Sequence, residues 1–270
     1  MGQLEGKKAV IVGAAGKGNM GQAIAKRFRK EGADVLVTSR RGAELEEFAR
    51  EIGGYSTVCD LTKRDDVFAL AKVAKEKMGR VDIAINSTGI NLGGPFLEYP
   101  EDKLDRMIAL QFKGPFFFLQ AFVEAMDQGG SIIQITSAVS LPNTPVFDHE
   151  AYMGTKAGID QVIRAVANQF GSRGLRLNSL AAGHTHSPMN SAVLRPWRDA
   201  AFIEQYPLGR LGTSDDVAAA CVWLSTDECF MTGQTLNVSG GLTLRRNPLP
   251  QDFERAEREW FIAHPEDQHF

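Results

Sequence analysis

The sequence lacks the features that would place this chain in a membrane, on a secretory route or around a metal ion. Its three cysteines, Cys59, Cys221 and Cys229, are widely separated and do not have the spacing of metal ligands. We expect them to be buried, reduced thiols of a cytoplasmic protein, and we expect no metal site. No apolar run approaches the roughly 18 residues that a membrane-spanning helix needs, and the N-terminal residues lack a signal-peptide pattern.

An excess of charge of either sign is also absent. The chain has 30 Lys and Arg residues against 33 Asp and Glu residues, a net charge of −3. This balance gives no electrostatic reason to expect a nucleic acid or an anionic membrane as a partner, so we expect a small-molecule substrate. With 270 residues, 43% of them hydrophobic, and no internal repeat or low-complexity linker, the chain suits one large α/β domain.

What the sequence does contain is a regular alternation of two patterns. Short apolar, β-branched runs alternate with amphipathic stretches of helical period. Continuous apolar strands between helices indicate a parallel sheet that is covered on both faces, which is a doubly wound, Rossmann-type α/β fold. The expected strands are residues 9–12, 34–38, 55–58, 82–85, 131–135, 175–180 and 235–238, and the expected helices include residues 21–31, 65–78, 102–126 and 213–224.

We expect this domain to occupy residues 1–242 and a C-terminal helical extension to occupy residues 243–270. Pro250 suits a helix start. The apolar residues that follow fall at helical spacing along one stripe: Phe253, Ala256, Trp260 and Phe261. A helix of this length is marginal alone in water and needs a surface on which to dock. Two interpretations stay open, a lid over the substrate pocket and a simple appendage.

Residues 13–21 form a glycine-rich turn between the first expected strand and the first expected helix. In a doubly wound sheet such a turn leads into a helix whose N-terminus binds pyrophosphate, and glycine lets the backbone approach the phosphates. A plain tight turn is the alternative, which the position between strand and helix disfavours. The turn residues expected to bind the cofactor are Gly13, Lys17, Gly18, Met20 and Gly21.

Tyr152 and Lys156 are four residues apart in a strongly helical segment, so they share one helix face. A phenol has a reference pKa of about 10. An ammonium group beside it favours the phenolate and moves the phenol toward acid–base work near neutrality. Upstream, Ser137 offers a hydroxyl that can hold a carbonyl oxygen. Together with a nucleotide-binding turn, these groups are the parts of a hydride-transfer site.

These motifs, and others that follow in the same order, make the sequence resemble the classical short-chain dehydrogenase/reductase family over about residues 5–241. The other motifs are Cys-Asp-Leu-Thr at 59–62, Asn-Ser-Thr-Gly at 86–89, Ile-Thr-Ser-Ala at 135–138, Ala-Gly at 182–183, Ser-Pro-Met at 187–189 and Val-Ser-Gly-Gly at 238–241. The resemblance implies further cofactor-binding residues: Asp60, Leu61, Asn86, Thr88, Gly89, Gly183, Thr185 and Ser187, with Tyr152 and Lys156.

The resemblance also implies catalytic roles. Tyr152 acts as general acid in reduction and as base in oxidation, Lys156 lowers its pKa and binds the nicotinamide ribose, and Ser137 hydrogen-bonds the substrate oxygen. Gln111 stands where the family has an asparagine that holds a water molecule for proton relay. A relay role and a purely structural role both stay open for Gln111. The glycine turn and the interval from Ser137 to Tyr152 are each longer than is usual in the family.

The end of the second expected strand bears on the choice of cofactor. Enzymes that use NAD usually place an acid there for the ribose 2′-hydroxyl, whereas the 2′-phosphate of NADP favours arginine. Here Ser39 stands in the place of the acid, Arg40 and Arg41 follow it, and Lys17 adds a basic group in the glycine turn. We therefore expect NADP(H) rather than NAD(H).

The sequence thus predicts an NADP(H)-dependent oxidoreductase that acts on a ketone or secondary alcohol of a small hydrophobic, cyclic or aromatic molecule. The residues expected to line its pocket are Leu92, Phe96, Leu141, Val146, Phe147, Val193, Leu194, Trp197 and Phe202. Two alternatives stay open, a 3-oxoacyl-thioester reductase of lipid synthesis and a non-catalytic nucleotide-binding scaffold. The family resemblance implies a homotetramer or dimer that packs through the helices expected at 102–126 and 152–170.

Overall fold

The centre of the molecule is a seven-stranded sheet whose strands all run parallel, in the order β3-β2-β1-β4-β5-β6-β9. The computed structural model describes residues 2–141, 146–186 and 195–266. The sheet strands are β1 (Lys8–Val12), β2 (Asp34–Ser39), β3 (Tyr55–Val58), β4 (Ile83–Asn86), β5 (Gly130–Ser137), β6 (Leu175–Ala182) and β9 (Thr235–Val238). Because the order reverses between β1 and β4, the sheet is doubly wound, and the predicted fold class is confirmed.

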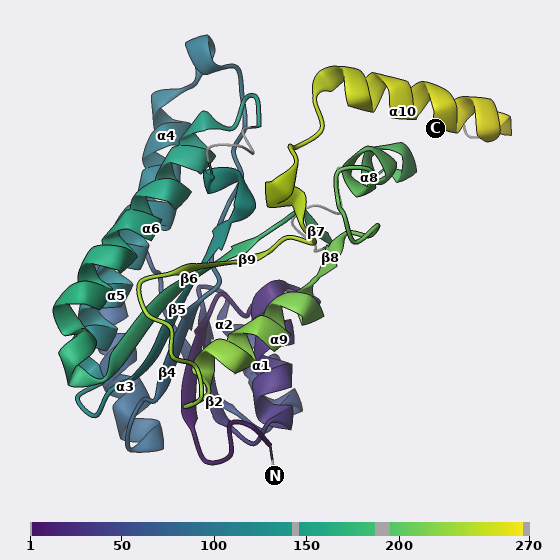
Figure 1. The fold of residues 1–270 in the computed structure, drawn as a ribbon. Coiled ribbons are helices and arrows are strands. Elements are labelled where there is room, and N and C mark those ends of the chain that lie inside the picture. The colour runs from purple at the N-terminus through teal and green to yellow at the C-terminus, as the bar shows by residue number, and fades with distance from the viewer. Residues whose placement is uncertain (1, 142–145, 187–194, 267–270) are drawn as a thin grey trace.

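Helices cover both faces of this sheet (Figure 1). Helices α1, α2 and α9 pack on one face, and α3, α5 and α6 pack on the other. The helices are α1 (Met20–Lys30), α2 (Gly42–Glu51), α3 (Arg64–Met78), α4 (Glu101–Ile108), α5 (Gly114–Ala125), α6 (Glu150–Phe170), α8 (Pro196–Ile203), α9 (Ser214–Ser225) and α10 (Pro250–Ala263). None of the helices within the described ranges is long and apolar enough to cross a membrane.

Single turns and a small second sheet complete the chain. The turns are η1 (Phe96–Glu98), η2 (Ala109–Lys113), η3 (Ala138–Ser140), η4 (Gly171–Arg173) and η5 (Leu242–Leu244). The second sheet pairs β7 (Thr185–His186) with β8 (Gly212–Thr213) beyond the carboxyl end of β6.

The strands are apolar throughout because each contributes side chains to two cores. In β1, Ala9 and Ile11 join the core beneath α1 and α9, whereas Val10 and Val12 join the core beneath α3 and α5. Successive side chains of a strand point to opposite faces, so a strand buried on both sides shows no polar alternation. This is the pattern from which the parallel sheet was predicted.

The helix expected at residues 102–126 differs from the prediction. It is divided into α4 and α5 by η2, a π-helical turn at Ala109–Lys113. Such a turn accommodates one residue more than an α-helical turn and often occurs at functional sites. Here it carries Gln111, whose side chain is buried. Sequence analysis also did not identify α2, nor α8, whose first residue Pro196 lies in a proline-containing stretch without clear period.

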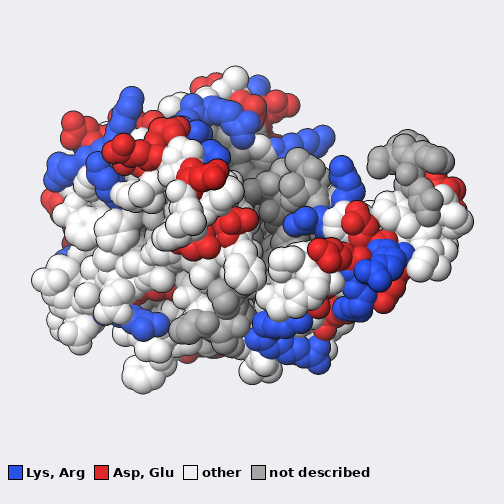
Figure 2. Space-filling model, turned by 90° about the horizontal axis from the view of Figure 1, so that it is seen from above, with Lys and Arg blue, Asp and Glu red and all other residues white. Residues whose placement is uncertain are grey.

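The C-terminal helix α10 begins at Pro250, as predicted, and packs against α8 away from the central sheet (Figure 1). Its first turn is held by Asp252, which accepts a hydrogen bond of 2.7 Å from the Leu249 amide and forms an ion pair with Arg246. Seen from above, α10 extends beyond the main body at the right, and basic and acidic side chains are intermixed on it (Figure 2). The pair α8–α10 therefore forms a wall above one end of the sheet.

Candidate functional site

A cleft of about 1380 Å³ lies at the carboxyl ends of the sheet strands. This edge is where ligands bind in doubly wound sheets, because loops from neighbouring strands converge there at the reversal of strand order. The predicted site residues that line the cleft are Gly13, Met20, Gly21, Ser39, Arg40, Arg41, Asp60, Leu61, Thr88, Gly89, Ser137, Tyr152, Lys156, Gly183 and Thr185. Residues from almost the whole length of the chain therefore meet at one place.

The remaining predicted residues lie elsewhere. Lys17 and Gly18 are exposed and do not line the cleft. Asn86 and Gln111 are buried behind it, and Asn86 accepts hydrogen bonds from the Thr88 amide (3.1 Å) and hydroxyl (2.8 Å). Asn86 therefore shapes the loop after β4 from below. Ser187 lies outside the described residues.

The glycine turn between β1 and α1 is built for close approach. Gly13 and Gly16 have φ angles of +96° and +106°, which favour glycine. Asn19, which the sequence analysis did not select, donates to the Gly13 carbonyl at 3.0 Å and caps α1 by accepting from the Gln22 amide at 2.9 Å. The preference of asparagine for helix N-caps could have identified it. The N-terminus of α1 thus opens onto the cleft, as phosphate binding requires.

At the end of β2 the two arginines differ. The Arg41 guanidinium donates to the Ala15 carbonyl at 3.0 Å and lies 3.3 Å from a Glu44 carboxylate oxygen, so it is already engaged with the glycine turn. Arg40 is exposed at the cleft and makes no hydrogen bond or ion pair with the residues that the structure describes. Arg40 is therefore the arginine that is available to a ligand.

Asp60 lies on the same side of the cleft. Burial raises the pKa of its carboxyl, but hydrogen bonds from Thr62, at 2.8 Å and 3.0 Å, and the charges of Arg40 and Lys63 outweigh burial and lower the pKa below its ordinary value. Asp60 is thus ionised and held by the loop after β3. An ionised carboxylate can accept hydrogen bonds from a cofactor ring.

The three catalytic candidates converge at the centre of the cleft. Ser137 ends β5, and Tyr152 and Lys156 share the face of α6 that is turned to it. The Lys156 side chain is only 3% exposed, and its Nζ donates to the Ile135 carbonyl at 3.1 Å and lies 5.8 Å from the centre of the Tyr152 ring. The grouping of Ser137, Tyr152 and Lys156 is as the sequence motif implies.

The pKa of Tyr152 moves in the direction opposite to our expectation. Burial raises it above the ordinary phenol value, and a hydrogen bond with Ser137 opposes that rise only in part. The Lys156 ammonium is directed at the Ile135 carbonyl, and burial lowers its own pKa to about 8, against the charge of Asp160. Burial sets this direction, and the lowering of the Tyr152 pKa by Lys156 stays a prediction. Tyr152 is a protonated phenol near neutrality, the form that a general acid needs.

Gln111 lies close to Lys156 without bonding to it. Its amide nitrogen donates to the Thr155 hydroxyl at 3.0 Å, and its carbonyl oxygen accepts from the Ile90 amide at 3.3 Å. A methyl group added to Gly89 would lie 3.3 Å from this oxygen and 3.5 Å from Lys156 Nζ, so both atoms approach the same glycine. Gln111 therefore ties the loop after β4 to α6 beside the lysine.

A second polar group, not predicted from the sequence, lies behind the catalytic residues. The Ser140 hydroxyl is 2.7 Å from the Ser137 carbonyl and 3.2 Å from an Asp160 carboxylate oxygen. Asp160 is one helical turn after Lys156, and burial raises its pKa although the hydrogen bond from Ser140 opposes the rise. The turn that carries Ser137 is thereby connected to α6.

The outer end of the cleft is formed by α8 and α10. The ring of Phe202 stacks on His184, with centroids 4.0 Å apart and planes at 4°, and meets Phe253 edge-on at 5.5 Å. Phe253 lines the cleft, whereas Trp260 and Phe261 do not. The stripe predicted in the tail thus contributes only its first aromatic residue.

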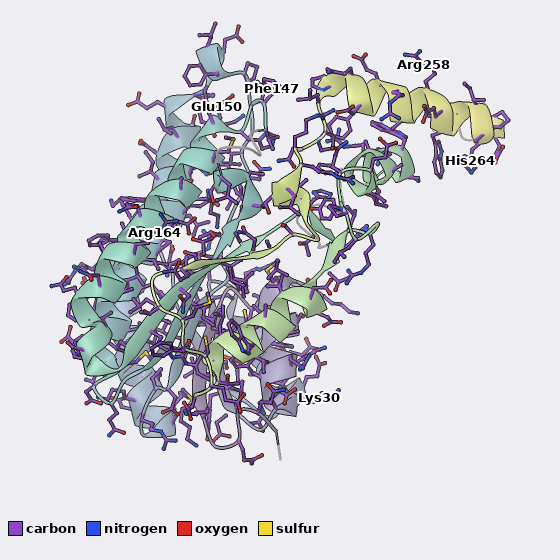
Figure 3. The ribbon with its side chains drawn as sticks, in the orientation of Figure 1. Lys30, Phe147, Glu150, Arg164, Arg258 and His264 are labelled. Carbon is purple, nitrogen blue, oxygen red and sulfur yellow. The ribbon has the colours of Figure 1, made fainter. Side chains whose placement is uncertain are left out.

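The apolar pocket was predicted only in part. Val146, Phe147 and Phe202 line the cleft, and Figure 3 shows Phe147 near the top of α6 on the side of α10. Leu92, Phe96, Leu141 and Trp197 do not line it, and the side chain of Phe96 is 68% exposed. Val193 and Leu194 lie outside the described residues. Within the described ranges, no cluster of three or more His, Cys, Asp or Glu side chains could hold a metal ion.

Comparisons with known proteins agree with this geometry. A family model described as enoyl-(acyl carrier protein) reductase matches residues 13–243. The chain belongs to the short-chain dehydrogenase/reductase family. Members of this family are oxidoreductases that use a nicotinamide cofactor, which supplies or accepts the hydride. The glycine turn, the open N-terminus of α1 and the unpaired Arg40 fit the binding of such a dinucleotide.

Individual members of the short-chain dehydrogenase/reductase family are similar over nearly the whole chain. A 3-oxoacyl-[acyl-carrier-protein] reductase, FabG, of Thermotoga maritima is 30% identical over 90% of this chain and 100% of its own. A 3beta-hydroxysteroid dehydrogenase of Eggerthella lenta is 32% identical over 89% of this chain and 95% of its own. A short-chain type dehydrogenase/reductase from Mycobacterium ulcerans superposes with a TM-score of 0.86, at 24% identity, over 91% of this chain and 93% of its own, and supports the fold alone.

Proposed function

We propose that this protein is an NADP(H)-dependent oxidoreductase that interconverts a ketone and a secondary alcohol on a small, largely hydrophobic molecule with a cyclic or aromatic body. The observation that carries this proposal is the convergence of Ser137, Tyr152 and Lys156 in one cleft, between the glycine turn and an aromatic wall. A proton donor, an oxygen-binding hydroxyl, a dinucleotide site and an apolar surface are what carbonyl reduction requires.

Each catalytic side chain has a distinct task. The Ser137 hydroxyl holds the substrate oxygen and stabilises the charge that develops on it. The Tyr152 hydroxyl gives its proton to that oxygen in reduction and takes it back in oxidation, and its raised pKa keeps the proton in place near neutrality. Lys156 binds the ribose hydroxyls of the cofactor beside Gly89.

The preference for NADP(H) rests on Arg40. Because Arg40 is exposed at the cleft and forms no hydrogen bond or ion pair with the described part of the chain, its guanidinium can receive a 2′-phosphate without breaking such a contact there. Replacing Arg40 with Ala should weaken NADPH binding by about 1.5–3 kcal/mol, the value of a charge-assisted contact. NADH binding should hardly change. Fluorescence titration of both cofactors checks this, and equal losses would contradict the assignment.

A 3-oxoacyl-thioester reductase is the second candidate, favoured by the name of the Thermotoga maritima relative. The cleft volume of about 1380 Å³ leaves room for a thioester arm beside the cofactor. A non-catalytic nucleotide-binding scaffold is less compatible with the site, because Ser137, Tyr152 and Lys156 all line the cleft.

The decisive experiment is Tyr152→Phe in steady-state assays with NADPH and a panel of cyclic ketones, aryl ketones and 3-oxoacyl thioesters. Loss of the proton donor should lower turnover by about 10²–10⁴-fold and leave cofactor binding intact. Tyr55→Phe removes a hydroxyl from a half-exposed tyrosine on β3 and should have no effect. Turnover within a few-fold of wild type for Tyr152→Phe would refute the catalytic assignment.

We also propose that the protein forms a homodimer or homotetramer. An apolar groove of about 440 Å³ lies between the outer faces of α5 and α6, lined by Phe116, Leu119, Val123, Val162, Val166 and Phe170 among others. On α6, Ile159 and Ile163 instead belong to the core. A matching helix face of a second copy would cover this groove. Sedimentation that shows only a 29.5 kDa monomer at micromolar concentration would refute this proposal.

A further inference from the structure

The outer wall of the cleft carries a guanidinium group that has no hydrogen-bond acceptor among the described residues. Arg198 on α8 lines the cleft and is half-buried. Its guanidinium carbon lies 4.7 Å from the centre of the Phe253 ring and 5.8 Å from that of Trp197. Among the described residues, no hydrogen bond or ion pair to Arg198 is formed. Its five N–H donors are therefore held in place by aromatic rings and remain available to a ligand.

Among the described residues, no ion pair joins Arg198 to the charged groups near it. The Asp199 carboxylate is directed to His186, with 3.7 Å between Oδ2 and Nε2; burial raises the pKa of Asp199, and the charges of His186 and Arg198 oppose that rise. Burial together with the charges of His186 and Arg198 lowers the pKa of His184 to about 4, so this imidazole is neutral at physiological pH. Arg198 is thus a fixed positive charge of this wall, and no carboxylate of the described residues forms an ion pair with it.

The same wall supplies an apolar surface beside that charge. The ring of Phe202 has His184 against its face and Phe253 at its edge, so α8 and α10 together present stacked aromatic groups to the cleft. Cation and rings come from two helices that pack against each other, and Ser137 and Tyr152 line the same cleft. The cleft therefore offers a carbonyl position and, at its outer wall, an apolar surface and an unpaired cation.

We propose that Arg198 binds an anionic group of the substrate, so that the substrate is a ketone or alcohol with a carboxylate at a distance from the reacting carbon. This proposal rests on the proposed function and narrows it. A guanidinium matches the two oxygens of a carboxylate in a bidentate fashion, while Phe202 and Phe253 pack against the hydrocarbon that joins the two ends. The phosphate on the arm of a carrier-bound 3-oxoacyl thioester also offers oxygens that a guanidinium can bind. The test below distinguishes such a phosphate from a substrate carboxylate.

The test compares acids with their esters. Wild type, Arg198→Ala, Arg198→Lys and the control Arg258→Ala are assayed with NADPH and three keto acids: 3-oxocyclohexanecarboxylate, 4-oxocyclohexanecarboxylate and 4-acetylbenzoate, each beside its methyl ester. Arg258 lies on the outer side of α10, outside the cleft lining (Figure 3). For at least one pair, we expect wild type and Arg258→Ala to favour the acid at least tenfold in kcat/KM. In Arg198→Ala, kcat/KM should fall about 10–100-fold for the acid and little for the ester. The fall in Arg198→Lys should be intermediate.

Three kinds of result would overturn the proposal. Equal losses on acid and ester in Arg198→Ala, or a wild type that favours every ester, would overturn the anion site while Tyr152-dependent turnover leaves the proposed function intact. A discrimination seen only between phosphorylated and unphosphorylated pantetheine thioesters would overturn the carboxylate and assign the anion to a carrier arm. Binding of acid and ester to Tyr152→Phe with NADPH gives a readout independent of turnover, and equal affinities there would also overturn the proposal.

Discussion

Gly21 offers a direct test of how the glycine turn is packed. A Cβ atom at position 21 would lie 2.6 Å from the Gly13 carbonyl oxygen, 2.9 Å from the Gly13 carbonyl carbon and 2.8 Å from Ser87 Oγ. Non-bonded carbon contacts prefer about 3.5–4.0 Å, so Gly21→Ala creates an overlap on the order of 1 Å. Two of the three atoms belong to the backbone at the end of β1 and cannot rotate away. The N-terminus of α1 must therefore move outward.

The expected magnitude follows from these contacts. Overpacking of this kind costs about 1–3 kcal/mol in unfolding free energy. Displacing Ser87 also endangers its 2.6 Å hydrogen bond to the Val12 carbonyl, a contact worth about 1 kcal/mol. The higher helix propensity of alanine offsets at most about 1 kcal/mol of this loss in unfolding free energy. We expect Gly21→Ala to be destabilised by about 1–3 kcal/mol and to bind NADPH at least about tenfold more weakly, because the first amides of α1 no longer face the cleft.

Denaturant unfolding and fluorescence titration with NADPH measure both effects. Gly171→Ala is the matched control, because a Cβ at position 171 has nothing within 4 Å and the residue has an ordinary φ of −58°. The control should match wild type in both assays. If Gly21→Ala unfolds at the same denaturant concentration as the control and binds NADPH equally well, the described packing of α1 against β1 is incorrect.

Three further predictions concern residues around the cleft. If the Gln111 amide relays protons, Gln111→Leu should lower turnover and leave NADPH affinity unchanged, and Gln111→Asn should retain partial activity. Normal turnover of Gln111→Leu would instead show that Gln111 has only a structural role. Asp160, whose pKa is raised above its ordinary value of 3.8, makes the folded state bind a proton more tightly than the unfolded state. The unfolding free energy of wild type should therefore fall relative to that of Asp160→Asn as the pH rises from 3.8 through the folded-state pKa. The same pH dependence of the unfolding free energy in both proteins would contradict this. Deleting residues 249–270 should leave NADPH binding intact and raise the KM for ketones or broaden the range of ketones that are reduced. Phe253→Ala should reproduce most of this effect, whereas Ile262→Ala, on the exposed side of α10, should not. Unchanged kinetics of the truncated protein would show that the tail is only an appendage.

The parts of the site that were predictable depend on local spacing. Tyr152 and Lys156 share a helix face because they are four residues apart, and any α-helix there would bring them together. The glycine turn is recognisable because positive φ angles and close approach require glycine itself. Likewise, the strands are recognisable because burial on both faces demands an uninterrupted apolar run.

What the sequence by itself determined was therefore the order of elements, the parallel sheet and the identity of the groups that can transfer a proton and hold a dinucleotide. Only the tertiary structure decided how those groups behave. The raised pKa of Tyr152 comes from burial, and the Lys156 side chain is directed at the Ile135 carbonyl; neither is encoded in spacing along α6. Arg198 and Phe253 meet because α8 packs against α10, across a separation in sequence that no local pattern spans. The physical reason is that propensity and periodicity act over a few neighbouring residues, whereas desolvation, charge pairing and the walls of a cleft depend on which distant segments pack together.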